Sequence, residues 1–263
     1  MKLFLNSDVG KHLPFLGVLL LLVASVRADD SATATTPPST NSPPAAAASP
    51  APAAPPSLPR DASILMTTKD GGMGSDGAPK DVDSYQVRVG ELYAPGGEAF
   101  ILPIYLPVVG EGERFKNVHL RLQMLAIFNE AGGNTIGNAD LYGLGVRDSF
   151  NLLASDYFQG PGPDPKATLL QANFLTPNSK PRTDPETGPF IETSAAGDAA
   201  LTKYFNEAYA KGAQPRQYLF LRISYDRDPI PAGNDAYQLL TSGAGGDQER
   251  PIITYTLEPG AKN

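Results

Sequence analysis

Apolar and polar residues alternate along most of the chain from Ala62 onward. The pattern is plainest around residue 118, in the apolar set Phe115, Val118, Leu120, Leu122 and Met124, with polar residues between most of them. Such alternation is typical of a half-buried antiparallel strand. Similar patterns predict further strands at Ser63–Thr68, Tyr85–Leu92, Phe100–Leu106, Ala139–Leu144, Thr168–Leu175, Gln217–Tyr225, Tyr237–Thr241 and Ile252–Leu257.

Clusters of turn-forming residues separate these strands. Gly, Pro, Asn and Asp gather at residues 70–77, 110–112, 132–134 and 160–165. Many short strands with such separators favour an all-β fold. The predicted architecture is an antiparallel β-sandwich or jelly roll.

One segment changes to a helical period. Its apolar residues recur about every 3.6 positions, at Leu201, Tyr204, Phe205, Ala208 and Tyr209. Asp198 is a good N-cap, and Gly212 stands where a left-handed residue often ends a helix. We therefore predict one amphipathic helix at about 198–212, with its aromatic stripe packed on the sandwich.

The strand at Gln217–Tyr225 is apolar on both faces. Leu219, Leu221 and Ile223 define one face, and Tyr218 and Phe220 the other. This pattern predicts a central strand, which we place between the second sheet and the helix.

The N-terminal residues 1–28 have the features of a cleavable secretory signal. Basic residues precede an apolar run at Leu13–Val26, and small residues flank Arg27 at the expected cleavage site. The run is shorter than the roughly 20 residues of a relaxed membrane span, although retention as an uncleaved anchor is the alternative. No second run of spanning length follows, so we expect no membrane span after cleavage and a secreted or cell-surface location.

Composition divides the rest of the chain. Residues 29–60 are rich in Pro, Ala, Ser and Thr and predict a disordered or partly polyproline linker. Residues 61–259 form the predicted β-sandwich domain, and residues 260–263 a short C-terminal tail.

Cysteine and charge exclude several functions. The absence of cysteine excludes disulfides, thiolate zinc sites and a cysteine nucleophile. The net charge is −7, and it becomes about −9 once the signal, which contributes +2, is removed. An acidic surface repels phosphate backbones, so we do not expect nucleic-acid binding.

Catalytic constellations are weak in this sequence. After signal removal the only histidine is His119, which its strand pattern places on the solvent face. The string Met73–Gly77 lacks the context of a nucleophile elbow. Scattered carboxylates leave a two-carboxylate glycan-degrading enzyme as a weaker alternative, and we expect no enzymatic activity.

An acidic segment follows the central strand. It offers Asp226, Asp228, Asn234 and Asp235, whose oxygens suit Ca²⁺. Their spacing does not match an EF-hand, and the alternative is that they shape turns around Pro229 and Pro231. Calcium is the one cofactor that the sequence indicates.

Tyrosines provide the candidate ligand-binding residues. Tyr142, Tyr157 and Phe158 lie near predicted turns, and Tyr105 falls on the outer face of a predicted edge strand. An aromatic ring with a polar tip can stack on a sugar or close the rim of a site. The chain has no Trp, which weakens the prediction of sugar binding.

Several strings together resemble a known class of domains. They are Tyr85–Gly90, Phe100–Pro103, Asn138–Gly145, Ser155–Tyr157, Asn173–Pro177, Tyr204 with Tyr209, and Tyr218–Arg222. Over residues 61–257 the chain resembles uncharacterised β-sandwich domains of exported bacterial proteins, and more distantly the DNRLRE-type carbohydrate-binding modules. The Leu-Arg-Phe-Asp-Leu string of that type is missing, so we transfer no binding residue.

These observations predict a secreted or cell-surface, non-catalytic module that binds an extracellular glycan or an envelope partner. The first alternative is a structural cell-surface protein without a small ligand. The weaker alternative is the carboxylate-dependent enzyme named above.

Overall fold

A computed structural model describes residues 60–65, 69–91, 96–129, 136–158, 163–184, 188–225, 235–247 and 249–260. The chain divides into two compact units, residues 1–53 and 54–263, and all described residues belong to the second. The predicted signal segment, residues 29–59 of the predicted linker and residues 261–263 lie outside the described residues.

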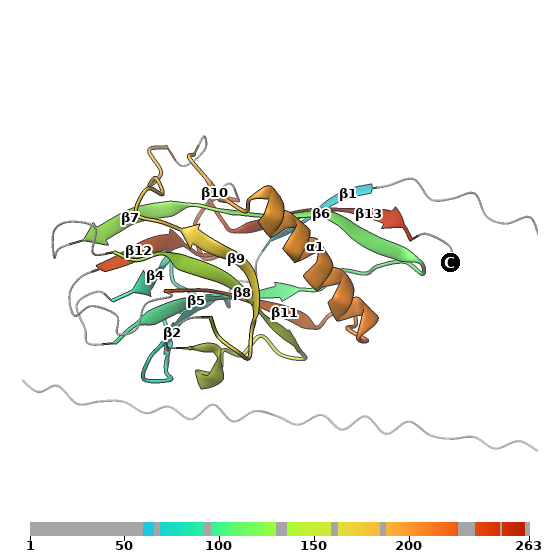
Figure 1. The fold of residues 1–263 in the computed structure, drawn as a ribbon, viewed down its shortest axis with the longest axis horizontal. Helices are drawn as coiled ribbons and strands as arrows, with labels where there is room; N and C mark the ends of the chain where they lie inside the picture. The colour runs from blue at the N-terminus through green and yellow to red at the C-terminus, as the bar shows by residue number, and fades with distance from the viewer. Residues whose placement is uncertain are drawn as a thin grey trace, which may run out of the picture. The chain divides into compact units, whose positions relative to one another are not determined.

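Two antiparallel sheets form the domain (Figure 1). The small sheet has the order β1 (Arg60–Leu65), β13 (Ile252–Pro259), β6 (Glu113–Leu122) and β10 (Ile191–Glu192). The main path of the large sheet is β7 (Met124–Asn129), β12 (Asp235–Leu240), β4 (Gln86–Gly90), β5 (Glu98–Tyr105), β11 (Tyr218–Tyr225), β8 (Ala139–Arg147) and β9 (Thr168–Leu175). The predicted all-β class is confirmed.

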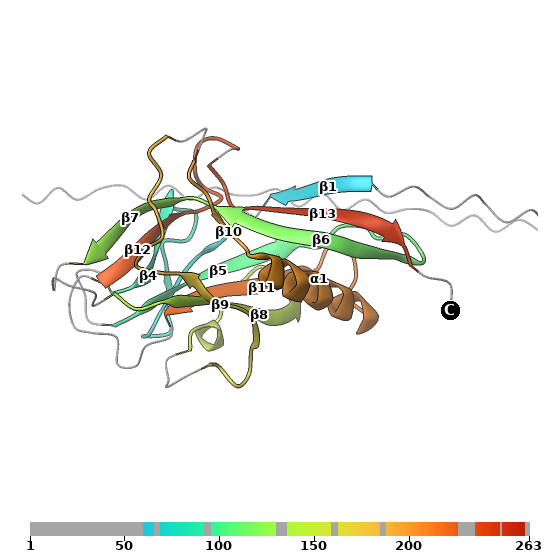
Figure 2. The same ribbon diagram turned by 45° about the horizontal axis from the view of Figure 1, so that its top comes forward.

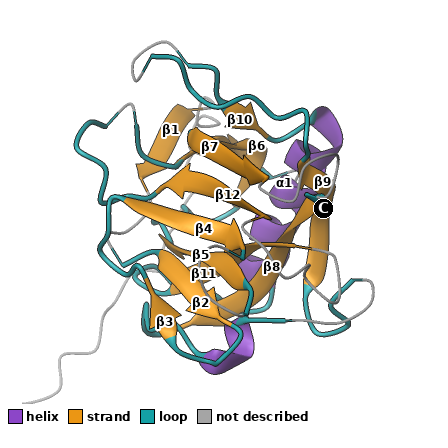
Figure 3. Ribbon diagram, turned by 90° about the vertical axis from the view of Figure 1, so that its left-hand side faces the viewer, coloured by secondary structure: helices purple, strands orange, loops and turns teal. Residues whose placement is uncertain are grey.

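Two short strands extend the large sheet beside β5. They are β2 (Gly71–Gly74), which pairs with β5, and β3 (Pro79–Lys80), which pairs with β2 (Figure 3). The sequence predicted only a loop at residues 70–77, so this part of the prediction was wrong. Three glycines in a four-residue strand hid the alternation that would have marked it.

One nearly continuous strand passes from the small sheet to the large one. β6 pairs with β13 and β10, and after Gln123 the chain continues as β7, which pairs with β12. The buried backbone oxygen of Gln123 accepts the N–H of Leu240 at 3.0 Å. This crossing joins the sheets along one side, and their apolar faces enclose the main core.

The helix α1 (Ala195–Ala210) lies between β6 and the β8–β9 side of the large sheet (Figure 2). Its predicted apolar stripe is confirmed, because Leu201, Tyr204, Phe205 and Ala208 are buried. The side chains of Thr202 and Asn206 also accept backbone N–H groups of β6, at 3.0 and 2.9 Å. α1 therefore supplies hydrogen bonds that a neighbouring strand would otherwise give.

The start of the helix differs from the prediction. Ser194 is the N-cap, and its hydroxyl accepts the N–H of Gly197 at 3.2 Å. Asp198 lies one turn later and contacts His119 instead. At the other end, Gly212 has a positive φ of 96°, as predicted for a residue that ends a helix.

The central position of β11 is confirmed, since β11 lies between β5 and β8. Leu219, Leu221 and Ile223 face the main core. Phe220 faces the other side, where Met73 of β2 and the segment after β8 cover it. The second face is thus covered by β2 and this segment, not by the helix.

Candidate functional site

Three aromatic rings, two of them exposed and one partly buried, form a group on the outer face of the large sheet. Tyr105 is 41% exposed and Phe150 38% exposed. Both contact the ring of Tyr218 edge-on, with centroids 5.4 and 5.7 Å away. We call Tyr105, Phe150 and Tyr218 the aromatic platform.

Strand register brings the platform together. Tyr105 ends β5 and Tyr218 begins β11, and the two residues are direct partners in the sheet. Directly opposed side chains lie on the same face of a sheet and contact one another. Phe150 follows β8, whose last residue, Arg147, is the partner of Tyr218 on its other side.

Polar groups lie beside the platform. Nε2 of Gln217 donates to Oδ1 of Asp148 at 2.7 Å, which connects the start of β11 to the segment after β8. The carboxylate of Asp148 and the amide of Gln217 are exposed hydrogen-bonding groups of the kind that recognise hydroxyls.

A guanidinium holds the segment that carries Phe150. Arg147 forms a two-point ion pair with the fully buried Asp156, and Nη1 lies 2.9 Å from Oδ2. Its guanidinium also lies over the ring of Phe220, 4.1 Å from the centroid. Asp156 belongs to a short 3-10 turn at Ala154–Asp156, so this pair fixes the segment between β8 and the turn.

A second, fully buried guanidinium lies deeper along β11. Nη2 of Arg222 lies 2.8 Å from Oδ2 of Asp164, and Nη1 donates to the backbone oxygen of Asp156 at 3.0 Å. The rings of Tyr142 and Phe158 flank the same guanidinium, with centroids at 4.9 and 5.8 Å. These contacts hold the guanidinium on the same face of β11 as Tyr218.

The structure separates the predicted ligand-binding residues into two groups. Tyr105 is part of the exposed platform. Tyr142 is only 2% exposed and lies with Phe158 against Arg222, while Tyr157 packs against the apolar cluster around Phe220. Tyr142 is therefore part of the buried packing, because its ring lies against the guanidinium of Arg222.

Sequence reasoning missed two platform residues. Tyr218 was assigned to a buried face of β11, and Phe150 was not considered. The position of Tyr218 in the sequence could have revealed its role. It is the first residue of a central strand, and the end of a strand is less completely covered by other segments than its middle.

A cavity of about 340 Å³ lies on the other side of the same strand ends. The residues that line it include Val146, Tyr204, Lys211, Gln217 and Leu219. The hydroxyl of Tyr204 accepts the N–H of Gly145, which shapes this wall. Gln217 thus contacts both the cavity and the polar edge of the platform.

His119 lies beside the start of α1. Its Nδ1 is 3.0 Å from Oδ1 of Asp198, and Nε2 is 3.9 Å from Glu192. The predicted solvent-facing position is only partly correct, because the ring is half-buried against the helix. The contact between His119 and Asp198 joins β6 to α1. The hydroxyl of Thr193 also contacts Nδ1 of His119, at 3.3 Å.

Two carboxyl groups near β2 have raised pKa values. Burial raises the pKa of Asp70 to about 7, although hydrogen bonds from Ser242 oppose this effect. Burial and the nearby charge of Asp81 raise the pKa of Glu98 to about 7, against the attraction of Arg88. Arg88 lies between Asp81 and Glu98, at 3.2 and 3.5 Å, so these carboxylates share an ion pair.

Of the four predicted calcium ligands, the structure describes Asp235 alone; Asp226, Asp228 and Asn234 lie outside the described residues. Asp235 is fully buried, and neither carboxylate oxygen has a hydrogen-bond partner. Within the described residues, no group of three or more His, Cys, Asp or Glu side chains is placed to hold a metal. The predicted four-ligand site thus stays a prediction.

A comparison of the chain with known protein families gives no match, and no curated protein is significantly similar to it. The helices of the described ranges are not long and apolar enough to cross a membrane.

Proposed function

We propose that this protein is an exported, non-catalytic binding module that takes an extracellular glycan on the aromatic platform. The observation that carries the proposal is the pair of half-exposed rings, Tyr105 and Phe150, held edge-on against Tyr218. Large apolar side chains are normally covered in a soluble domain, and a group left open marks an interaction surface.

Sugar chemistry matches this surface. A pyranose ring presents C–H groups on its faces and hydroxyls around its edge. The C–H faces stack on aromatic rings, while the hydroxyls hydrogen-bond to nearby polar groups. The platform supplies the rings, and Gln217 and Asp148 supply an amide and a carboxylate beside them.

Charge limits the class of glycan. The chain carries a net −7, and a carboxylate lies at the platform itself. An acidic polysaccharide is repelled by both the overall charge and this local one. We therefore propose a neutral polysaccharide as the ligand.

An ion pair holds one part of the platform in place before a ligand binds. Arg147 and its buried partner Asp156 fix the segment that carries Phe150. Pre-organised side chains lose little conformational entropy when a ligand binds, and this increases affinity for a given contact area.

Affinity gel electrophoresis of the full chain against a panel of neutral and acidic polysaccharides tests the proposal. We expect retardation by at least one neutral polysaccharide and none by its acidic counterparts. Tyr218→Ala and Tyr105→Ala should each weaken that retardation by roughly tenfold or more, since each ring contributes on the order of 1.5 kcal/mol.

Tyr85→Ala is the matched control. Tyr85 is also 41% exposed but lies elsewhere, where its hydroxyl accepts from Arg182 at 2.7 Å. The control should bind like the unsubstituted protein. Equal losses in Tyr85→Ala and Tyr218→Ala, or no retardation by any polysaccharide, would refute the proposal.

A further inference from the structure

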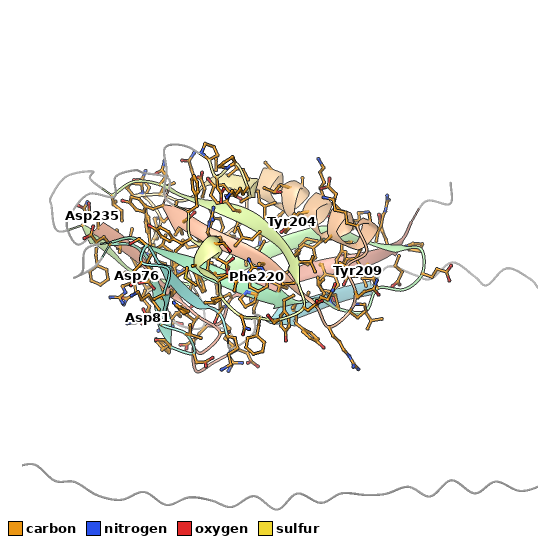
Figure 4. The ribbon with its side chains drawn as sticks, turned by 90° about the horizontal axis from the view of Figure 1, so that it is seen from below. Asp76, Asp81, Tyr204, Tyr209, Phe220 and Asp235 are labelled. Atoms are coloured by element: carbon orange, nitrogen blue, oxygen red, sulfur yellow. The ribbon has the colours of Figure 1, made fainter. Side chains whose placement is uncertain are left out.

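We propose that Asp235 anchors a calcium site at the end of the large sheet, with side-chain oxygens of Glu91 and Asn129 as neighbouring donors. The site is independent of the glycan proposal. The platform is at the first residue of β11, whereas Asp235 begins β12, the strand that follows β11 in the chain; Figure 4 labels Asp235 at one end of the domain.

The starting observation is a buried carboxylate without a partner. Asp235 has no exposed surface, and neither Oδ1 nor Oδ2 has a hydrogen-bond partner. An isolated carboxylate in such a place costs several kcal/mol unless it is protonated or paired with a positive charge. A bound cation removes this cost.

Strand register places a second oxygen donor next to Asp235. Asn129, the last residue of β7, is the direct partner of Asp235 across the β7–β12 pair. Partners in register lie on the same face, with Cβ atoms about 5 Å apart. The amide side chain of Asn129 is therefore on the same face of the sheet as the carboxylate of Asp235.

A second carboxylate lies on the other side of β12. The N–H of Glu91, the residue after β4, donates to the backbone oxygen of Asp235 at 2.9 Å. Glu91 is itself 91% buried, with only 9% of its surface exposed. Two carboxylates buried on adjoining strands repel each other, and a divalent ion between them reverses this repulsion.

Gly90 allows the two strands to approach closely here. A Cβ at this position would lie 2.4 Å from the backbone oxygen of Asp235, and φ is 118°. The close approach brings the backbone of Glu91 onto Asp235. Register thus places Glu91, Asp235 and Asn129 side by side on one face of the sheet, a row of two carboxylates and one amide.

The donor set selects the type of metal. Carboxylate and amide oxygens suit hard cations, whereas zinc and copper prefer imidazole or thiolate. Ca²⁺ accepts six to eight oxygens in flexible geometry and completes its shell with water or backbone oxygens. Mg²⁺ demands nearly ideal octahedral geometry, which a row of strand side chains does not provide.

Thermal unfolding of the full chain at pH 7 tests this site. The unfolding midpoint is measured in three separate samples, which contain CaCl₂, MgCl₂ or a chelator. Calcium at a hundred times its dissociation constant should lower the unfolding equilibrium constant about a hundredfold. For a domain of this size that raises the unfolding midpoint by roughly 5–10 °C. Mg²⁺ at the same concentration should give a clearly smaller rise.

Asp235→Asn should abolish the calcium response. In the presence of chelator this variant should be at least as stable as the unsubstituted protein. The amide of Asn has almost the same shape as the carboxylate of Asp but carries no charge to bury. Asp247→Asn is the matched control, since Asp247 is an exposed carboxylate whose side chain is 76% accessible. The control should keep the full calcium response.

Terbium luminescence gives a second readout that does not depend on stability. The chain has 11 tyrosines and no tryptophan, so Tb³⁺ bound near Tyr237 should emit when tyrosine is excited. Ca²⁺ should displace it, and Glu91→Gln should weaken it even if Asp235→Asn fails to fold. Absence of a calcium shift in the unsubstituted protein, or an equal shift in Asp235→Asn, would overturn the proposal.

Discussion

Arg222 and Asp235 are both fully buried, yet their surroundings differ completely. Arg222 has a carboxylate, a backbone oxygen, a hydroxyl and two aromatic rings around its guanidinium. Asp235 has no hydrogen-bond partner for either oxygen. A buried charge is stable where its partners are built into the fold, and it needs a ligand or a proton where they are not.

The difference follows from the position of each residue in the large sheet. Arg222 lies in the middle of β11, where β8 and the segment after it provide Tyr142 and Asp164. Asp235 is the first residue of β12, where its strand neighbours are Asn129 on one side and Glu91 on the other, and neither is a cation. The middle of the sheet therefore holds a completed structural network, whereas at its end the carboxylate of Asp235 has no hydrogen-bond partner, which is the basis of the proposed calcium site.

The largest effect expected from breaking the completed network is at Asp164. Asp164→Ala leaves Arg222 buried without its carboxylate and should lower the free energy of unfolding by about 3–5 kcal/mol. Urea denaturation measures this change. The double variant Asp164→Ala with Arg222→Met should recover much of the loss, because a pair of apolar residues avoids the desolvation cost. A single-variant loss no larger than that of Asp247→Ala would show that the pair is unimportant.

Protonation is the third way in which this protein accommodates buried carboxyl groups. The folded pKa values of Asp70 and Glu98 are about 7, above the ordinary values of 3.8 and 4.5. The folded state therefore binds more protons than the unfolded state between pH 4 and 7. The stabilisation is complete below pH 4 and is lost as the pH rises to about 7.

We expect the contribution of each of these two groups to fall by roughly 3–4 kcal/mol over that pH range. Asp70→Asn and Glu98→Gln should each flatten the dependence of the unfolding free energy on pH. Denaturation at intervals from pH 4.5 to 8 provides the measurement. A profile that is unchanged in both variants would assign the pH dependence to other groups.

The smallest effect concerns the contact between α1 and the large sheet. The hydroxyl of Tyr204 accepts the N–H of Gly145 and lies 3.4 Å from the backbone oxygen of Phe220. Tyr204→Phe leaves these buried groups without the hydroxyl and should cost about 1–2 kcal/mol. Tyr209→Phe, which removes a similar bond to Pro107, is a suitable comparison. Unchanged stability in Tyr204→Phe would mean that water replaces the hydroxyl.

The fold class was predictable because period-2 alternation and the helical stripe of α1 reflect burial directly. β6 departs from strict alternation at one point. Phe115 and Val118 are both buried although they are three residues apart, because Asn117 has a φ of 54° at a bulge opposite β13. Asn tolerates this left-handed conformation better than most residues, so the extra residue does not disturb the apolar face.

The candidate site was less predictable, because it depends on contacts between distant segments. Tyr105 and Tyr218 become neighbours only through the register of β5 with β11. Similarly, Asp140 and Arg147, which lie near the two ends of β8, do not pair with each other. Arg147 instead binds Asp156, and Asp140 accepts the hydroxyl of Tyr142 and the N–H of Asn173. Local sequence separation does not reveal which carboxylate lies under which guanidinium.

Residue-resolved NMR of the full chain during titration with a neutral oligosaccharide would show where the oligosaccharide binds. We expect saturable shift changes concentrated at the amides of Tyr105, Phe150 and Tyr218, and their loss in Tyr218→Ala. Saturable changes confined to the side of α1, or no changes with any neutral oligosaccharide of the panel, would contradict the assignment of the aromatic platform as a glycan-binding surface.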